Sequence, residues 1–97
     1  MVDKGILLKT TGIATCCALV ATTKDKSLMA HISPTMNIDL LLRTLIAINN
    51  DISIKLYRCA FYGYEYALDK AVLICSKLGI ETYDVYIVDI MDTISNV

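Results

Sequence analysis

The sequence predicts an α+β fold in which two helices pack on a mixed or antiparallel β-sheet, forming a two-layer or three-layer sandwich. Two stretches place apolar residues at helical spacing, and five others alternate or are rich in apolar and β-branched residues. Along the chain these segments follow the order β-β-β-α-β-α-β. The chain of 97 residues is long enough for one hydrophobic core of ordinary size, and we expect a single domain over residues 1–97.

The first third of the chain predicts strands joined by short turns. The polar run Thr10-Thr11-Gly12 ends the first strand pattern, and the charged run Lys24-Asp25-Lys26 makes a turn that allows a hairpin. Pro34 ends the third strand, because proline donates no backbone hydrogen bond and pushes the preceding residue toward an extended conformation. The three expected strands cover residues 5–9, 16–22 and 27–32.

Two helices follow, separated by one strand, and a last strand completes the sheet. Asn37 is expected to cap the first helix, which ends at Asn49-Asn50, and Gly79 is expected just beyond the end of the second. The strands cover residues 52–57 and 83–90, with a frayed tail from Met91. Both helical stripes need one common surface, so we expect these residues to face the sheet: Leu41, Leu42, Leu45, Ile46, Leu68, Ala71, Val72 and Cys75.

Charge and hydropathy argue against nucleic acid and membrane as partners. Charged residues are 20% of the chain and the net charge is −1, without the basic surplus that binds a phosphate backbone or an anionic membrane. The longest uncharged run, residues 10–23, is shorter than the roughly 20 apolar residues of a membrane helix. Hydrophobic residues reach 56%, above the usual value of roughly 45–50%, so we expect a dense core, a homo-oligomer interface, or both.

The four cysteines are expected to be free thiols. Cys16 and Cys17 are adjacent and poorly placed to bridge each other, and no C-x-x-C motif occurs. With His31 as the only histidine, the usual zinc spacings are unfilled, so we expect no metal site. Free thiols are typical of a reducing compartment, which predicts a cytoplasmic protein.

Residues 9–17 carry the pattern that points to catalysis. Small and hydroxyl residues form a turn that feeds a strand, and Cys16 stands where the turn becomes the strand. Such a turn aims backbone N–H groups at the oxyanion that forms when a thiolate attacks a carbonyl carbon. His31, on the expected partner strand, is the candidate base, with Thr10 or Thr11 orienting its ring. The alternative is that Cys16 is a core residue and His31 is structural.

The same residues resemble a known family. Residues 10–16, Thr-Thr-Gly-Ile-Ala-Thr-Cys, resemble the T-x-G-[LI]-[GA]-[ST]-C signature of the CheD chemoreceptor glutamine deamidases. Met29-Ala30-His31, with Pro34 close behind, resembles that family's M-A-H segment. The resemblance implies that Cys16 is the nucleophile, that His31 is the catalytic histidine, and that Thr10 is the threonine that assists it.

What the resemblance implies for function is a cytoplasmic hydrolase linked to chemotaxis. Such an enzyme converts a protein glutamine to glutamate through a thioester, and it needs no metal or organic cofactor. Its partners are a protein substrate that carries a glutamine and a regulatory protein. Thr11, Gly12 and Thr15 are then the residues that shape the turn and support the oxyanion.

The chain departs from the family pattern after its middle strand. The family carries a glycine-rich G-G-A segment there, whereas residues 58–64 read Arg-Cys-Ala-Phe-Tyr-Gly-Tyr. The catalytic pair is kept, while the surroundings that would face the substrate differ. Phe61, Tyr62 and Tyr64 are expected either to form a rim that grips a protein substrate or to pack under the sheet as a turn. Arg58 beside them is expected to be solvated.

Two other classes of function stay open beside the deamidase. One is a catalytically inactive CheD-like module that binds a protein partner through the aromatic cluster. The other is a small redox-sensing protein in which the thiol of Cys16 or Cys59 is oxidised. The deamidase is the leading prediction, because it uses the turn, Cys16 and His31 together.

Overall fold

The computed structural model describes residues 1–48 and 51–96, which form two helices and seven strands. In chain order the elements are β1 (Val2–Asp3), β2 (Lys9–Thr10), β3 (Cys17–Thr22), β4 (Lys26–Ile32), α1 (Asp39–Ala47), β5 (Ser53–Cys59), α2 (Glu65–Lys77), β6 (Asp84–Val88) and β7 (Ile94–Ser95). The expected end of the first helix at Asn49-Asn50 lies outside the described residues.

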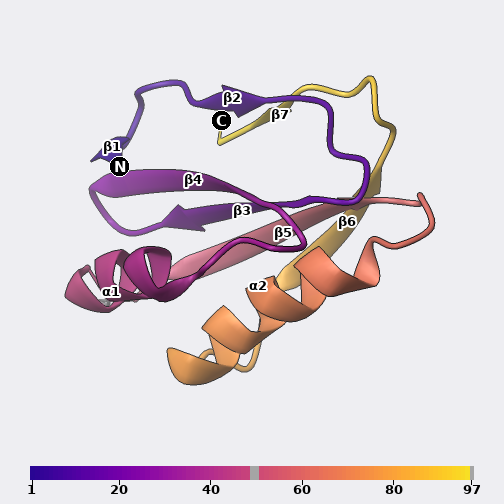
Figure 1. Cartoon of the computed structure of the whole chain (residues 1–97). Coiled ribbons are helices and arrows are strands. Elements are labelled where there is room, and N and C mark those ends of the chain that lie inside the picture. The colour runs from indigo at the N-terminus through magenta and orange to yellow at the C-terminus, as the bar shows by residue number, and fades with distance from the viewer. Residues whose placement is uncertain (49–50, 97) are drawn as a thin grey trace.

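The strands form a five-stranded mixed sheet of order β1-β4-β3-β5-β6 and a two-stranded sheet of β2 and β7. Both helices lie against one face of the larger sheet, and the small sheet lies over the other face (Figure 1). The predicted α+β class, with two helices packed on a mixed sheet, is confirmed. The observed order contains two-residue strands that the sequence pattern does not predict.

β3 is the central strand of the larger sheet. It pairs with β4 as the predicted antiparallel hairpin, and on its other side it pairs antiparallel with β5. The hairpin turn is closed by Thr23, whose N–H donates to the Lys26 carbonyl at 2.9 Å and whose hydroxyl accepts from the Lys26 N–H at 3.0 Å. β6 is parallel to β5. The connection through α2 returns the chain to the end of the sheet at which β5 begins, so both strands run in the same direction.

Core residues lie on both faces of β3, whose residues 17–21 are all buried. Cys17 and Leu19 face the helices, whereas Ala18 and Val20 face the small sheet. A strand that is covered on both sides consists of a continuous apolar run instead of an alternating one. This explains why the segment from Cys17 to Ala21 contains no polar residue.

The helical stripes face the sheet as predicted, with one error. All the predicted positions except Ile46 are buried or partly buried in the helix-side core. Ile46 is 55% exposed, because Leu45 takes the inward position and the next residue is rotated by roughly 100° around the helix axis. Ala67 and Ile74 of α2 are buried as well, although the sequence pattern did not single them out.

The two helices are short elements that cover the sheet. α1 has 9 residues and α2 has 13, and each buries one side. Gly79 acts as predicted, because it follows α2 with a φ of +73°. The prediction that Asn37 caps α1 is wrong by one residue: Ile38 is the N-cap, and Asn37 forms a turn before it, in which Asn37 Oδ1 accepts the Asp39 N–H at 2.9 Å. Among the described residues, no helix combines the length and the apolar character that crossing a membrane requires.

The strand predicted over residues 5–9 is wrong. Gly5 has a φ of +99°, a left-handed conformation that turns the chain directly after β1. Ile6 and Leu7, whose apolar side chains suggested a strand, are 54% and 50% exposed. Of this segment only Lys9 belongs to a strand, and that strand is β2 in the small sheet.

The frayed tail predicted from Met91 is also wrong, because it contains β7. Ile94 pairs with Thr10 in the small sheet. Next to this pair, Asn96 Oδ1 accepts the N–H of Leu8 at 2.7 Å, a bond between residues 88 positions apart. A strand that depends on such a distant partner leaves no local periodic pattern in the sequence.

The helix phase gives a matched pair of leucine variants. Leu45→Ala should lower the free energy of unfolding by about 2–5 kcal/mol, because Leu45 is 0% exposed and its truncation leaves a cavity. Leu40→Ala, in the same helix but 76% exposed, should change it by about 0.5 kcal/mol or less. Urea denaturation of both variants checks the difference, and equal losses would contradict the observed phase of α1.

Candidate active site

The turn between β2 and β3 places Cys16 directly before the central strand, which begins at Cys17. Gly12 has a φ of +72°, a conformation that glycine adopts at no steric cost. One residue later, the Ile13 side chain is 1% exposed and belongs to the core under the small sheet. This buried anchor fixes the path of the turn, while Thr11 and Thr15 are exposed on it.

Cys16 and His31 lie on the same face of the larger sheet. The register pairs Ala18 directly with His31, and facing residues of neighbouring strands point to the same side. Ala18 belongs to the core under the small sheet, and Cys16 packs against that same core. Cys17, the next residue, lies in the helix-side core, as the two-residue period of a strand requires.

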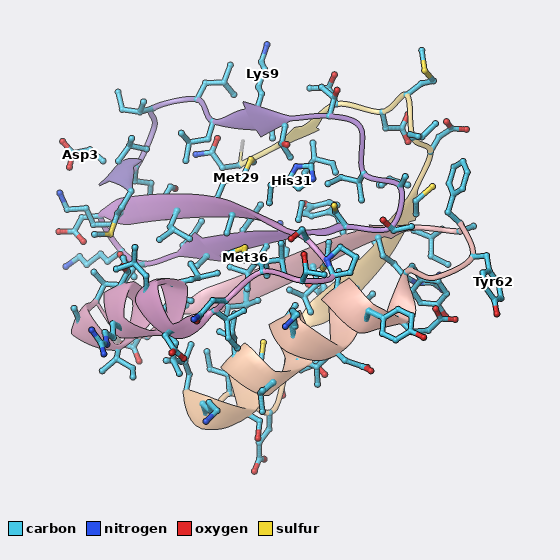
Figure 2. The ribbon with its side chains drawn as sticks, in the orientation of Figure 1. Asp3, Lys9, Met29, His31, Met36 and Tyr62 are labelled. Carbon is cyan, nitrogen blue, oxygen red and sulfur yellow. The ribbon has the colours of Figure 1, made fainter. Side chains whose placement is uncertain are left out.

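Thr10 contacts the ring of His31 from the strand above it. Thr10 Oγ1 lies 3.0 Å from His31 Nδ1, and the pair is exposed to solvent. His31 projects from β4 toward the small sheet, as does Met29 two residues earlier (Figure 2). β2 holds Thr10 in this position through its pairing with Ile94 of β7. The expected pairing of Thr10 with His31 is therefore found, and the strand that the sequence did not predict supports it.

The four thiols have different surroundings. All are free, and only Cys16 is partly exposed; Cys17, Cys59 and Cys75 are buried. Burial raises the pKa of Cys17 to about 12, because the apolar interior disfavours the thiolate. Burial also raises the pKa of Cys75. Of the described thiols, Cys16 is thus the one positioned for attack on a carbonyl carbon.

Cys59 is a neighbour of the site that sequence reasoning did not place there. Arg58 of β5 pairs with Cys17, so the next step of the same antiparallel register brings Cys59 opposite Cys16. Both belong to the core under the small sheet. Cys59 also lines an open hollow of about 430 Å³, together with Ala60, Phe61, Tyr62, Val88, Asp89 and Ile90. The alternation of residues along β5 indicates which side of the sheet Cys59 faces. The sequence does not indicate the register of β5 with β3, which brings Cys59 near Cys16.

The aromatic residues around Gly63 separate into two kinds. Phe61 and Tyr62 are 48% and 98% exposed, and Tyr62 points away from the body of the molecule (Figure 2). Tyr64 is partly buried, and the guanidinium of Arg58 lies over its ring at 3.8 Å from the centroid. The expectation that Arg58 is solvated is therefore wrong, because this contact with an aromatic face draws it against the protein.

The aromatic turn borders the turn that carries Cys16. Gly63 has a φ of +94°, and a Cβ added to it would lie 3.7 Å from Cγ2 of Thr15. Thr15 directly precedes Cys16, so the turn that carries the exposed residues Phe61 and Tyr62 borders the segment that carries the candidate nucleophile. A protein segment that reaches Cys16 from this side would pass over them.

Residues that could bind a metal are scattered. Within residues 1–48 and 51–96, no group of three or more His, Cys, Asp or Glu side chains is arranged to hold an ion. Asp89 and Asp92 form a turn instead, in which Asp92 Oδ2 accepts the N–H of Asp89 at 2.8 Å.

Comparison with known proteins adds no relative: no family model matches the chain, and neither the curated proteins nor the solved structures contain a match. The resemblance to the CheD deamidases consequently rests on residues 10–16 and 29–34 alone. The geometry of the site has to carry the functional argument.

Thiol labelling of the folded protein tests the separation of the cysteines. At pH 8, iodoacetamide should modify Cys16 and leave Cys17 untouched, because the thiolate fraction of a thiol with a pKa of about 12 is negligible there. Mass spectrometry of the tryptic peptides identifies the modified residue, and denatured protein, in which all four thiols react, is the control. Rapid labelling of Cys17 in the folded state would contradict the assigned strand face.

Serine substitutions test the same separation by stability. Cys17→Ser places a hydroxyl in an apolar core and should cost about 1–3 kcal/mol of the free energy of unfolding. Cys16→Ser, at a partly exposed position, should cost under about 1 kcal/mol. Thermal denaturation of both proteins measures the difference. The reverse order of losses would mean that the strand presents its other side to the helices.

Proposed function

We propose that the protein is a cysteine-dependent deamidase that converts glutamine side chains of a protein to glutamate through a thioester. The observation that carries the proposal is the 3.0 Å contact between Thr10 Oγ1 and His31 Nδ1, on the sheet face that also carries Cys16. A lone histidine needs a partner to fix its ring before it can serve as a base. Thr10 is that partner here, and it occupies the position that the CheD resemblance assigns to the assisting threonine.

The contact with Thr10 occupies Nδ1 of His31 and leaves Nε2 as the ring nitrogen for the chemistry. When Nδ1–H donates to Thr10 Oγ1, Nε2 has no proton and is free to take one from a thiol. Cys16 then attacks the carboxamide carbon of a glutamine as the thiolate. Backbone N–H groups around Thr15 and Cys16 stabilise the oxyanion of the tetrahedral intermediate.

The remaining steps return the enzyme to its starting state. The C–N bond breaks, and His31 gives its proton to the departing ammonia, leaving a thioester between Cys16 and the substrate. His31 then takes a proton from water, whose oxygen attacks the thioester carbon. The C–S bond breaks, the protonated His31 returns its proton to the departing thiolate of Cys16, and glutamate is released. No metal or organic cofactor enters this sequence, and the free thiol it needs suits a reducing cytoplasm.

The substrate we propose is a protein segment and not free glutamine. The contact between Thr10 and His31 is exposed to solvent, and the turn at Gly63 that borders Thr15 carries an aromatic residue, Tyr62, that is 98% exposed. Tyrosine and phenylalanine are enriched where proteins contact one another. Because these rings replace the glycine-rich segment of the CheD family, the chain is expected to act on a different protein from a chemoreceptor.

A protein-binding module without activity is the second candidate. It is favoured by the same exposed rings of Phe61 and Tyr62, which would bind a partner whether or not Cys16 reacts. A thiol sensor is favoured by the facing positions of Cys16 and Cys59. Activity measurements on site variants distinguish both from the deamidase.

Substitutions in the site should abolish deamidation. Cys16→Ala and His31→Ala should each reduce ammonia release from a denatured, glutamine-rich protein such as casein by about 10²–10⁴-fold. The two losses should not add in the double variant, because thiol and imidazole act as one unit. Mass spectrometry of the substrate for glutamate in place of glutamine is the second measurement, and hydroxylamine trapping reports the thioester.

Thr10 supplies the matched control. Thr10→Val removes the hydroxyl at nearly constant shape and should slow the reaction by about 2–10-fold, the value of one hydrogen bond. Thr10→Ser keeps the hydroxyl and should retain most of the activity. Deamidation that is unaffected by Cys16→Ala would overturn the proposal, and intact binding of a partner without any turnover would favour the inactive module.

A further inference from the structure

The two edges of the larger sheet differ in how open they are to pairing with another strand. One edge is β1, which has 2 residues and carries the pair of Asp3 with Lys26. Short strands and charged side chains of this kind prevent edge-to-edge pairing. The other edge is β6, which has 5 residues and contains neither lysine nor proline. The backbone groups along its outer side are a template for another strand.

The side chains of β6 are exposed although its middle is apolar. Val85, Tyr86 and Ile87 are 45%, 40% and 63% exposed. Val85 pairs with Leu56, whose side chain is in the helix-side core, so Val85 and Ile87 lie on the helix side of the sheet. α2 packs over β3, β4 and β5, and these two side chains stay uncovered beyond it.

Symmetry restricts how two copies of β6 can pair. A two-fold axis perpendicular to the sheet relates two antiparallel copies of the strand. Facing residues must point to the same side of the sheet, so the axis has to lie midway between a residue and the same residue of the partner. Tyr86 is the middle residue of β6, and centring on it pairs every strand residue with another strand residue. Val85 then faces the partner's Ile87, and Asp84 faces the partner's Val88.

This register is complementary on both faces. On the helix side it joins Val85 and Ile87 of each copy into one apolar cluster. On the other side Tyr86 meets the partner's Tyr86, and each is already stacked on its own Tyr57 with ring centroids 5.1 Å apart. No like charges face each other, because the carboxylate of Asp84 lies opposite a valine.

We propose that β6 is the interface of a homodimer, in which two copies pair antiparallel about Tyr86 and join two five-stranded sheets into one. The inference is independent of the deamidase proposal. The two-fold axis is perpendicular to the sheet, so both copies carry their helices on one side and their Cys16 and His31 on the other. The occupant of the edge is a second copy of this chain, because the strand is complementary to itself.

The oligomeric state of two isoleucine variants tests the interface. The wild-type protein should sediment as a dimer at micromolar concentration. Ile87→Lys places two lysines near the axis and should weaken the dimer by at least about tenfold, a loss of 1.4 kcal/mol or more. Ile46→Lys on α1 is the matched control, since Ile46 is 55% exposed and Ile87 is 63% exposed. It should leave the dimer unchanged.

Disulfide cross-linking tests the register. In a Cys16→Ala background, Tyr86→Cys should cross-link to its own copy under mild oxidation, because that position pairs with itself. Asp84→Cys is the control: it lies two residues from the axis, so the two introduced thiols would be roughly 14 Å apart and should not cross-link. Cross-linking also reports the pairing if Ile87→Lys fails to fold.

Several results would overturn the proposal. A wild-type monomer, a dimer that Ile87→Lys leaves intact, or open-ended assembly would each contradict a closed pair through β6. A monomer whose β6 amide signals shift when a glutamine-bearing peptide is added would assign this edge to a peptide strand. None of these outcomes changes the activity expected of Cys16 or His31, so failure of this inference is separable from failure of the deamidase.

Discussion

Burial of β3 on both faces is the constraint on which the candidate site depends. Because successive residues of a strand point to opposite sides, Cys17 belongs to the helix-side core and the side of Cys16 belongs to the core under the small sheet. Burial raises the pKa of Cys17 to about 12, which removes it from chemistry near neutral pH. A slip of one residue by β3 would exchange the faces of the two thiols, whereas the same slip by β4 would turn His31 toward the helices.

The small sheet is the second constraint, and it depends on contacts between the two ends of the chain. β2 is held by β7 and by Asn96, whose side chain bonds to the backbone of Leu8 and Ile6. Without this pairing, Thr10 would have no fixed position over His31. The candidate site thus combines His31 of the local hairpin with Thr10, which is positioned by contacts between distant parts of the chain. The position of Thr10 therefore depends more on the two ends of the chain than that of His31 does.

Sequence reasoning succeeds here where a local rule applies. The hairpin, the glycine that follows α2, and the opposite faces of Cys16 and Cys17 all follow from strand period and turn chemistry. The prediction that Ile46 faces the sheet is wrong, because a helical pattern does not distinguish an apolar residue at the inward position from an apolar residue next to it. β7 was not predicted, because a strand of two residues that pairs with a distant strand is too short to show an alternating pattern in the sequence.

The candidate site divides in the same way. The contact between Thr10 and His31 agrees with the motif, whereas the position of Cys59 opposite Cys16 needs the register of β5, which only the folded sheet supplies. The contact between Arg58 and Tyr64 was missed for a related reason. A charged side chain such as that of Arg58 is expected to be in water unless the fold brings an aromatic ring next to it. Here the turn at Gly63 brings the ring of Tyr64 back to Arg58.

The turn at Gly63 also indicates how one catalytic arrangement can serve another substrate. Its glycine adopts a left-handed conformation against Thr15, so the turn is tied to the segment that carries Cys16. Tyr64 is held by Arg58, whereas Tyr62 is free to contact another molecule. Rings that are exposed but anchored at their base lose little conformational freedom on binding. Under the proposed function, changing these rings would alter which protein is recognised and would leave the thiol, imidazole and hydroxyl in place, so recognition and chemistry could vary separately.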